Sequence, residues 1–188
     1  TDWRELLAKE GDRIDSVNIA VPDHNHTIIA THAMRAGKHV YCQKPLCHEI
    51  AECRLLRDTA KRQGVVTQLG VQFSAGIGDR MAVAYHQAGV IGTVEHIYLF
   101  SNRKGVSRIR TLRPAKADPV PASLDWDLWI GTAPFRPYAE KVYHPLIWRI
   151  WQDFGSGWIG DIGCHLHSSV WKGIGLTTPI SVKAEVQE

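Results

Sequence analysis

Long apolar runs, paired cysteine motifs and a strong excess of charge are all missing from this sequence of 188 residues. No stretch approaches the ~18 consecutive apolar residues that a membrane-spanning helix needs, so no membrane partner is expected. The formal net charge is only +3, too small an excess to indicate nucleic acid binding. The four cysteines (Cys42, Cys47, Cys53 and Cys164) form neither a Cys-x-x-Cys pair nor a zinc-binding spacing, so we expect all of them to be reduced.

The glycine-rich loop of dinucleotide-binding folds is also missing. No Gly-x-Gly-x-x-Gly occurs in the chain, which starts at Thr1 with a helix-like segment instead of a strand, loop and helix. We therefore expect the sequence to be a fragment of a longer protein. Reduced cysteines favour the cytoplasm, while a secreted or periplasmic origin stays open because a leader segment would precede Thr1.

The first part of the chain alternates helix-like and strand-like segments joined by short turns. The helix-like segments are residues 1–11, 25–37 and 48–64, and the strand-like segments are residues 15–22, 38–42 and 65–73. Because parallel neighbours in a sheet need crossover helices, this order predicts an α/β fold with a doubly wound parallel sheet.

The pattern changes after residue 73. Residues 78–89 have helical spacing, and residues 93–100 read as a strand. An irregular basic segment follows, with Arg103, Lys104, Arg108, Arg110, Arg113 and Lys116 among prolines. A solvated loop is the favoured interpretation of that segment, and a lid that binds an anion or a sugar is the alternative.

Tryptophans concentrate in the last third of the chain, in "LDWDLWIGTAPFRPY" (124–138) and "YHPLIWRIWQDFGSG" (143–157). Aromatic rings between acidic and basic residues suit either a packed core or the wall of a carbohydrate site. The composition alone favours neither.

Lys44 stands just after the strand-like run of residues 38–42 and just before Pro45. Ligands collect at the carboxyl ends of the strands in an open parallel sheet. The loop of residues 21–26 follows another strand and shares that edge. Lys44 is therefore a candidate for contact with a ligand.

A second polar group lies in residues 157–173. On a helix, one stripe would contain Asp161, His165, Ser168 and Lys172. A carboxylate one turn before a histidine can orient the ring and stabilise its protonated form, as a general base requires. Asp161 and His165 are thus the candidate acid/base pair, and a solvent-facing polar stripe is the alternative.

Metal binding is the rival use of the histidines. His24-x-His26 and His165-x-His167 each offer two side chains. Residues i and i+2 of a helix point apart, however, and no third ligand accompanies either pair. We expect no metal site.

Two ordered motifs resemble those of the Gfo/Idh/MocA family, named for glucose–fructose oxidoreductase and inositol dehydrogenase. "NIAVPDHNHTIIATHAMRAGKHVYCQKP" is similar to the family's strand, Pro-x-x-x-His loop, helix, Gly-Lys-His-Val and Glu-Lys-Pro. "IWRIWQDFGSGWIGDIGCH" is similar to its Trp-Arg, glycine pair and Asp-x-Gly-x-His. The resemblance covers essentially the whole chain, and residues 124–138 look like a bacterial subgroup associated with sugars and glycosides.

The resemblance implies two domains. Residues 1–73 would be the C-terminal part of a Rossmann dinucleotide-binding domain whose glycine-rich first βαβ unit is absent. Residues 74–188 would be part of an α/β domain with a mainly antiparallel sheet, which binds the substrate and forms the interface of a homo-oligomer.

The resemblance also implies roles for individual residues. Lys44 would lie beside the reacting hydroxyl, with Asp161 and His165 as the acid/base pair, and the Lys44–Pro45 bond would be cis. The residues by the cofactor would be Val21, Pro22, His26, Gln43, Lys44, Trp148 and Arg149. Those by the substrate would be Lys44, Arg149, Asp161 and His165. Gln43 stands where the family has glutamate.

The implied activity is reversible hydride transfer between a sugar or polyol hydroxyl and NAD or NADP, with NAD favoured. Two alternatives stay open. One is a glycosidase or lyase that oxidises a glycoside transiently to a keto-sugar on bound NAD. The other is a homologue that binds sugars without catalysis.

Overall fold

The computed structural model describes residues 2–101, 113–114 and 116–185. Two compact units divide the chain, one of Thr1–Val71 with Asn102–Cys164 and one of Gln72–Ser101 with His165–Glu188. Most of the predicted basic loop falls on residues 102–112, outside the described residues. The division into domains at residue 73 stays a prediction.

The first unit begins with alternating helices and strands. In chain order these are α1 (Trp3–Glu10), η1 (Gly11–Arg13), β1 (Ser16–Ile19), η2 (Asp23–Asn25), α2 (His26–Arg35), β2 (His39–Gln43), α3 (Ile50–Gln63) and β3 (Thr67–Gly70). The side chain of Asp2 caps α1 by accepting the backbone N–H of Arg4 at 2.8 Å. Glu49 and Glu52 form a capping box at the start of α3.

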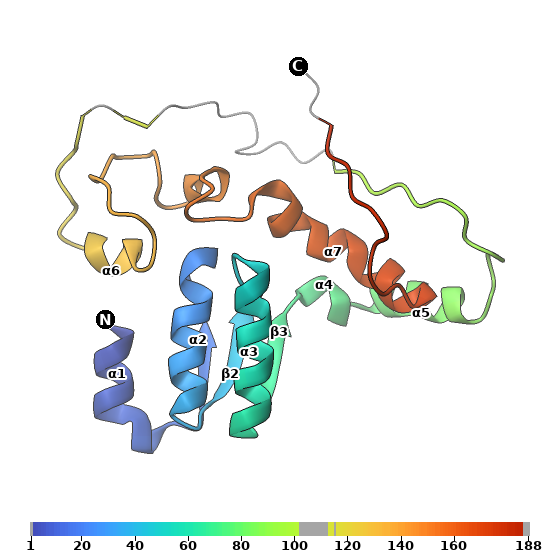
Figure 1. Ribbon diagram of the computed structural model, residues 1–188, viewed down its shortest axis with the longest axis horizontal. Helices are drawn as coiled ribbons and strands as arrows, with labels where there is room; N and C mark the ends of the chain where they lie inside the picture. The colour runs from blue at the N-terminus through green and yellow to red at the C-terminus, as the bar shows by residue number, and fades with distance from the viewer. Residues whose placement is uncertain (1, 102–112, 115, 186–188) are drawn as a thin grey trace. The chain divides into compact units, whose positions relative to one another are not determined.

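The three strands form one parallel sheet in the order β1-β2-β3. Val17 pairs with Val40, and Val40 pairs with Thr67. Helices α2 and α3 lie side by side over one face of the sheet, as the crossover connections require (Figure 1). The α/β class with a parallel sheet is therefore confirmed.

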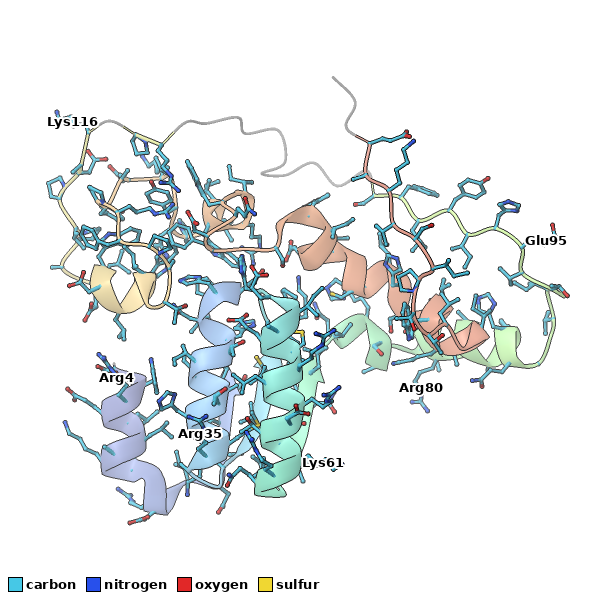
Figure 2. The ribbon with its side chains drawn as sticks, in the orientation of Figure 1. Arg4, Arg35, Lys61, Arg80, Glu95 and Lys116 are labelled. Carbon is cyan, nitrogen blue, oxygen red and sulfur yellow. A yellow bond between two sulfur atoms is a disulfide. The ribbon has the colours of Figure 1, made fainter. Side chains whose placement is uncertain are left out.

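An apolar layer between that face of the sheet and its two helices forms the first core. Its fully buried members include Ile19, Ala33, Met34 and Cys42. Figure 2 shows Arg35 and Lys61 toward the C-terminal ends of α2 and α3, where cations complement the helix dipole. The opposite edge of the sheet, where the strands end, is left for the polar groups described below.

A second core in the same unit consists of aromatic side chains. It is built around α6 (Trp126–Ile130) and η4 (Ile147–Ile150). Trp126 stacks on Trp129 with 4.8 Å between ring centroids, and the ring of Phe154 meets Trp129 edge-on at 4.9 Å. Trp126 and Phe154 are buried, so this part of the tryptophan-rich sequence is packing.

The second unit is helical. It contains α4 (Gln72–Ala75), α5 (Ile77–Gln87) and the C-terminal half of α7 (Gly157–Ile174), which starts in the first unit. None of the helices described here combines the length and the apolar character that a membrane span requires.

The predicted strand over residues 93–100 is wrong. Those residues have no regular secondary structure, and Tyr98 and Phe100 are more than 80% exposed, at 83% and 84%. The described residues from 72 to 185 contain no strand, so the predicted antiparallel sheet is not found among them. Alternation of apolar and polar residues can favour an extended segment, but a strand also needs backbone hydrogen bonds to a neighbouring strand.

The expectation of four reduced cysteines is also wrong. Cys47 and Cys53 form a disulfide, with Cα atoms 6.0 Å apart. The chain turns after Pro45 and places Cys47 beside the first turn of α3, which sequence spacing alone does not reveal. The cytoplasmic location stays a prediction. Burial raises the pKa of the Cys42 thiol to about 12, so that thiol is inert at neutral pH.

The packing of the aromatic core can be tested with a matched pair of variants. Phe154 is fully buried, whereas Phe135 in the same region is 73% exposed. We expect Phe154→Ala to lower the free energy of unfolding by about 3–5 kcal/mol, and Phe135→Ala to change it by less than about 0.5 kcal/mol. Urea unfolding followed by tryptophan fluorescence measures both, and equal effects would contradict this packing.

Candidate active site

Lys44 directly follows β2, at the carboxyl edge of the sheet. The Lys44–Pro45 bond is cis, as expected. The Nζ of Lys44 donates to Oδ1 of Asp161 at 2.5 Å and to the main-chain carbonyl of the same residue. Both side chains are largely buried, with 15% and 13% of their surfaces exposed. Two of the three predicted catalytic residues therefore form an ion pair.

Arg149 adds a second cation to this pair. Its Nε lies 3.3 Å from Oδ1 of Asp161. Burial acts to raise the pKa of Asp161, but hydrogen bonds and attraction from Lys44 and Arg149 outweigh it and leave that pKa below its usual value. Asp161 is thus a carboxylate held between two cations. We call these three residues the Lys44–Asp161–Arg149 cluster.

A buried polar loop after β1 supports this cluster through contacts with the tryptophan-rich region. Asp23, His24 and Asn25 are 3%, 4% and 6% exposed, yet all three bind main-chain groups of the tryptophan-rich region. Oδ2 of Asp23 accepts from the backbone N–H and the hydroxyl of Ser156, at 3.1 and 2.9 Å. Ser156 immediately precedes α7, so this bond fixes the start of the helix that carries Asp161.

The other two residues of the loop hold the end of α6. The ring nitrogens of His24 lie 3.2 Å from the Phe154 carbonyl and 3.0 Å from the Ile130 carbonyl. Burial lowers the pKa of His24, although its carbonyl partners act in the opposite direction. Asn25 donates to the Trp129 carbonyl at 2.9 Å. We call Asp23, His24 and Asn25 the polar latch.

Gly131 shows how closely the latch approaches α6. Its φ of +53° is unfavourable for a residue with a side chain, and an added Cβ would lie 2.0 Å from Oδ1 of Asn25. Only glycine allows this contact.

A cleft of about 490 Å³ opens beside the cluster. Its lining residues are Ala20, Val21, Pro22, Asp23, Gln43, Lys44, Trp129, His144, Pro145, Leu146, Trp148 and Arg149. All of the predicted cofactor residues except His26 are among them. The wall formed by Trp129, His144 and Leu146 was not predicted from the sequence. The tryptophan-rich composition was the one sequence feature that pointed to this wall, but it did not distinguish the cleft-lining Trp129 from the buried Trp126.

His26 is buried instead of lining the cleft. It is 1% exposed, and its ring nitrogens lie 2.8 Å from the Pro45 carbonyl and 2.9 Å from the Val21 carbonyl. It thereby joins the loops that follow β1 and β2. In this structure its contacts are with the two loops that frame the cleft.

The predicted polar stripe of α7 divides between the two units. His165 belongs to the second unit, where it is 8% exposed and its ring lies 4.5 Å from that of Phe73. Ser168 donates to Asp79 at 2.9 Å, and Lys172 donates to Ser74. Asp161 and His165 of the stripe are buried, whereas Lys172 is exposed, so the stripe as a whole does not face solvent.

The metal alternative finds no support in the described part of the chain. No three side chains of His, Cys, Asp or Glu gather there in an arrangement that could hold an ion. The ring nitrogens of His24 and His26 are directed at carbonyl groups.

Comparison with known proteins identifies two family profiles in succession. Residues 1–71 match the NAD-binding Rossmann fold of an oxidoreductase family, GFO/IDH/MocA, and residues 108–188 match the C-terminal alpha/beta domain of the same family.

Among curated proteins, the chain is 28% identical over 167 residues to levoglucosan dehydrogenase of Pseudarthrobacter phenanthrenivorans, which covers 88% of this chain and 34% of that protein. It is 33% identical over 94 residues to a glycosyl hydrolase family 109 protein of Shewanella sp. strain ANA-3, covering 50% of this chain and 20% of that protein. A solved structure, an oxidoreductase domain protein from Kribbella flavida, superposes with a TM-score of 0.61 at 27% identity and covers 93% of this chain and 38% of that one. The chain thus spans well under half the length of each.

The charge of Asp161 generates a prediction about pH. Because the pKa of Asp161 is lowered in the folded state, its ion pairs stabilise the fold above the unfolded value of about 4, and this contribution is lost as the pH falls through the folded pKa. Asp161→Asn should lower the free energy of unfolding by about 2 kcal/mol at pH 7, and by much less near pH 3.

Denaturant titrations of both proteins between pH 3 and pH 7 measure this difference. Asp12→Asn is the control, because Asp12 is exposed. A stability difference for Asp161→Asn that is constant over this range, or that grows in acid, would contradict the proposed charge state.

Proposed function

The chain belongs to the Gfo/Idh/MocA oxidoreductase family, and we propose that its parent protein transfers a hydride between a hydroxyl of a sugar or polyol and a nicotinamide dinucleotide. The observation that carries the proposal is the buried Lys44–Asp161 pair at the carboxyl edge of a parallel sheet, beside a cleft. The levoglucosan dehydrogenase relative supports a sugar-like substrate. Because the chain spans only part of its relatives, the activity is proposed for the whole parent protein.

The cleft fits the nicotinamide end of such a cofactor. Val21 and Pro22 supply apolar contact at the end of β1, while Gln43 and Lys44 supply hydrogen-bond donors at the end of β2. Trp148 and Arg149 complete the lining from the tryptophan-rich region. A nicotinamide held by these residues would supply the hydride-transfer chemistry at the substrate carbon. NAD is the favoured form.

Lys44 is proposed to stabilise the negative charge that develops on the substrate oxygen. A partly buried ammonium group does this more strongly than one in water, because the surroundings screen it less. Asp161 holds Lys44 in place through the 2.5 Å contact. Arg149 shares that carboxylate and is proposed to contact the substrate as well.

His165 is proposed as the general base that takes the hydroxyl proton. It follows Asp161 by one turn of α7. In the oxidative direction the O–H proton moves to the imidazole as the C–H hydride leaves, so that the alcohol becomes a ketone. The reverse reaction returns the same proton to the oxygen.

The organisation of the parent protein is part of the same proposal. Residues 1–73 would complete a Rossmann domain, and residues 74–188 would contribute to a domain that binds substrate. By analogy with the family we also propose a homo-oligomer.

A second candidate is an NAD-dependent glycosidase or lyase that works through a transient keto-sugar. The match to a glycosyl hydrolase family 109 protein favours it, as does the partly exposed Trp129 ring in the cleft wall, since such a ring can stack on a sugar. Lys44, Asp161 and His165 would keep the same roles, because the first step is the same oxidation.

Substitution of Lys44 tests the hydride-transfer proposal. We expect Lys44→Met to lower kcat of the parent protein by about 10²- to 10⁴-fold, because the developing oxyanion loses its cation. The assay follows the absorbance of reduced nicotinamide with a panel of sugars, polyols and anhydrosugars. Lys61→Met, at an exposed lysine of α3, is the control. Full activity of Lys44→Met would show that Lys44 is not catalytic.

The two candidate activities differ in their net redox change. A dehydrogenase forms reduced nicotinamide in proportion to product. A keto-sugar glycosidase cleaves aryl glycosides with no net change in that absorbance. Measuring both signals in one reaction therefore assigns the activity, and release of the aryl group without net reduction would replace the first proposal by the second.

A further inference from the structure

His26 is the first residue of α2, and its ring joins two loops of the first unit. It is only 1% exposed, so the ring is shielded from solvent. Its Nδ1 lies 2.8 Å from the carbonyl oxygen of Pro45, and its Nε2 lies 2.9 Å from the carbonyl oxygen of Val21. Both distances are in the normal range of an N–H···O hydrogen bond. Each ring nitrogen therefore faces a group that can only accept a hydrogen bond.

A neutral imidazole cannot satisfy both of these contacts. It has one N–H donor, and its other nitrogen carries a lone pair that accepts. One nitrogen of a neutral His26 would then face a carbonyl oxygen with no hydrogen between the two atoms. Only the imidazolium form donates from both nitrogens. Hydrogen bonds from a charged donor are also roughly twice as strong as those from a neutral one.

We propose that His26 is a buried imidazolium whose two hydrogen bonds position Lys44 for the reaction. The proposal rests on the function proposed above. Pro45 directly follows Lys44, and Val21 lines the cleft. One cation therefore fixes the loop that carries the Lys44 amine against the loop that would contact the nicotinamide. Hydride transfer depends on the spacing of these two loops, because the reacting atoms must lie about 3–3.5 Å apart.

The carboxylate of Asp23 offsets the cost of burying this cation. Asp23 lies three residues before His26, and the groups of Ser156 that donate to it are neutral, so they leave its charge in place. That charge is felt at the end of β2, where burial and then Asp23 raise the pKa of the Cys42 thiol. A negative charge at this position also compensates the positive end of α2, which would otherwise oppose an imidazolium.

The other titratable groups of the two loops leave this balance intact. The ammonium of Lys44 is paired with Asp161 at 2.5 Å. The ring nitrogens of His24 lie 3.0–3.2 Å from their carbonyl partners, farther than those of His26. Burial outweighs these bonds and lowers the pKa of His24, so that ring is neutral at pH 7. His26 is thus the cation that faces Asp23 in this loop.

Neutron diffraction from crystals of the perdeuterated parent protein tests the charge directly, because it locates ring hydrogens that X-ray diffraction at ordinary resolution does not show. At pH 7.5 a histidine in water is mostly neutral and carries one ring hydrogen. We expect deuterium on both Nδ1 and Nε2 of His26. Deuterium on only one of these nitrogens would overturn the proposal, whatever the variants below do.

Two substitutions distinguish one required hydrogen bond from two. An asparagine amide can replace Nδ1 and a glutamine amide can replace Nε2, so His26→Asn keeps only the bond to Pro45 and His26→Gln only the bond to Val21. We expect both variants to lower kcat of the parent protein by about 10- to 100-fold, with a smaller change in KM for the sugar, because Lys44 is displaced. His32→Asn, at an exposed histidine of the same helix, is the control and should leave kcat unchanged.

The outcomes separate this proposal from the one on which it rests. Wild-type kcat in either His26 variant would refute the need for two bonds and leave hydride transfer standing. A parent protein that transfers no hydride with any sugar, polyol or anhydrosugar would overturn the proposed function, and the neutron map would still decide the charge of His26. The same map decides it if neither variant folds, because it is measured on the unaltered protein.

Discussion

The ion pair of Lys44 and Asp161 joins two points of the chain that are 117 residues apart. Taking an ammonium and a carboxylate out of water is costly unless each finds the other in good geometry. Much of the first unit can be understood as meeting that requirement. The parallel sheet brings Lys44 to its carboxyl edge, α7 brings Asp161, and Arg149 takes part of the carboxylate's remaining capacity. A loss of register in either part would leave a charge buried without its partner.

The polar latch explains how the two parts stay in register. Buried carboxylate, imidazole and amide groups need hydrogen-bond partners, and Asp23, His24 and Asn25 each find one on a main-chain group of the tryptophan-rich region. Main-chain partners do not depend on side-chain rotamers, so the contact is rigid. His26 extends the same support to the loops beside Lys44. A site made from two regions is therefore held by four consecutive polar residues.

Local features of the fold were predictable from the sequence, and long-range features only in part. The helices and parallel strands of residues 2–70 were predictable from periodicity, caps and short turns. The cluster of Lys44, Asp161 and Arg149 was assembled from a resemblance to a family and not from spacing. The predicted strand over residues 93–100 was wrong. Alternation of apolar and polar residues is only a local pattern, and no described segment pairs with these residues. The prediction that Cys47 and Cys53 are reduced was wrong for a similar reason, because a turn of the chain brings the two cysteines together.

Local sequence was sufficient for the elements themselves: a lysine after a strand, a carboxylate on a glycine-rich helix, and a run of polar residues after β1. Helix and strand formation depend on near neighbours, which the sequence displays directly. Tertiary structure alone decided that Asp161 binds Lys44, that Trp126 is packing while Trp129 lines a cleft, and that His26 supports loops. Each of these depends on which distant groups surround a side chain, and burial and charge pairing are properties of the folded arrangement.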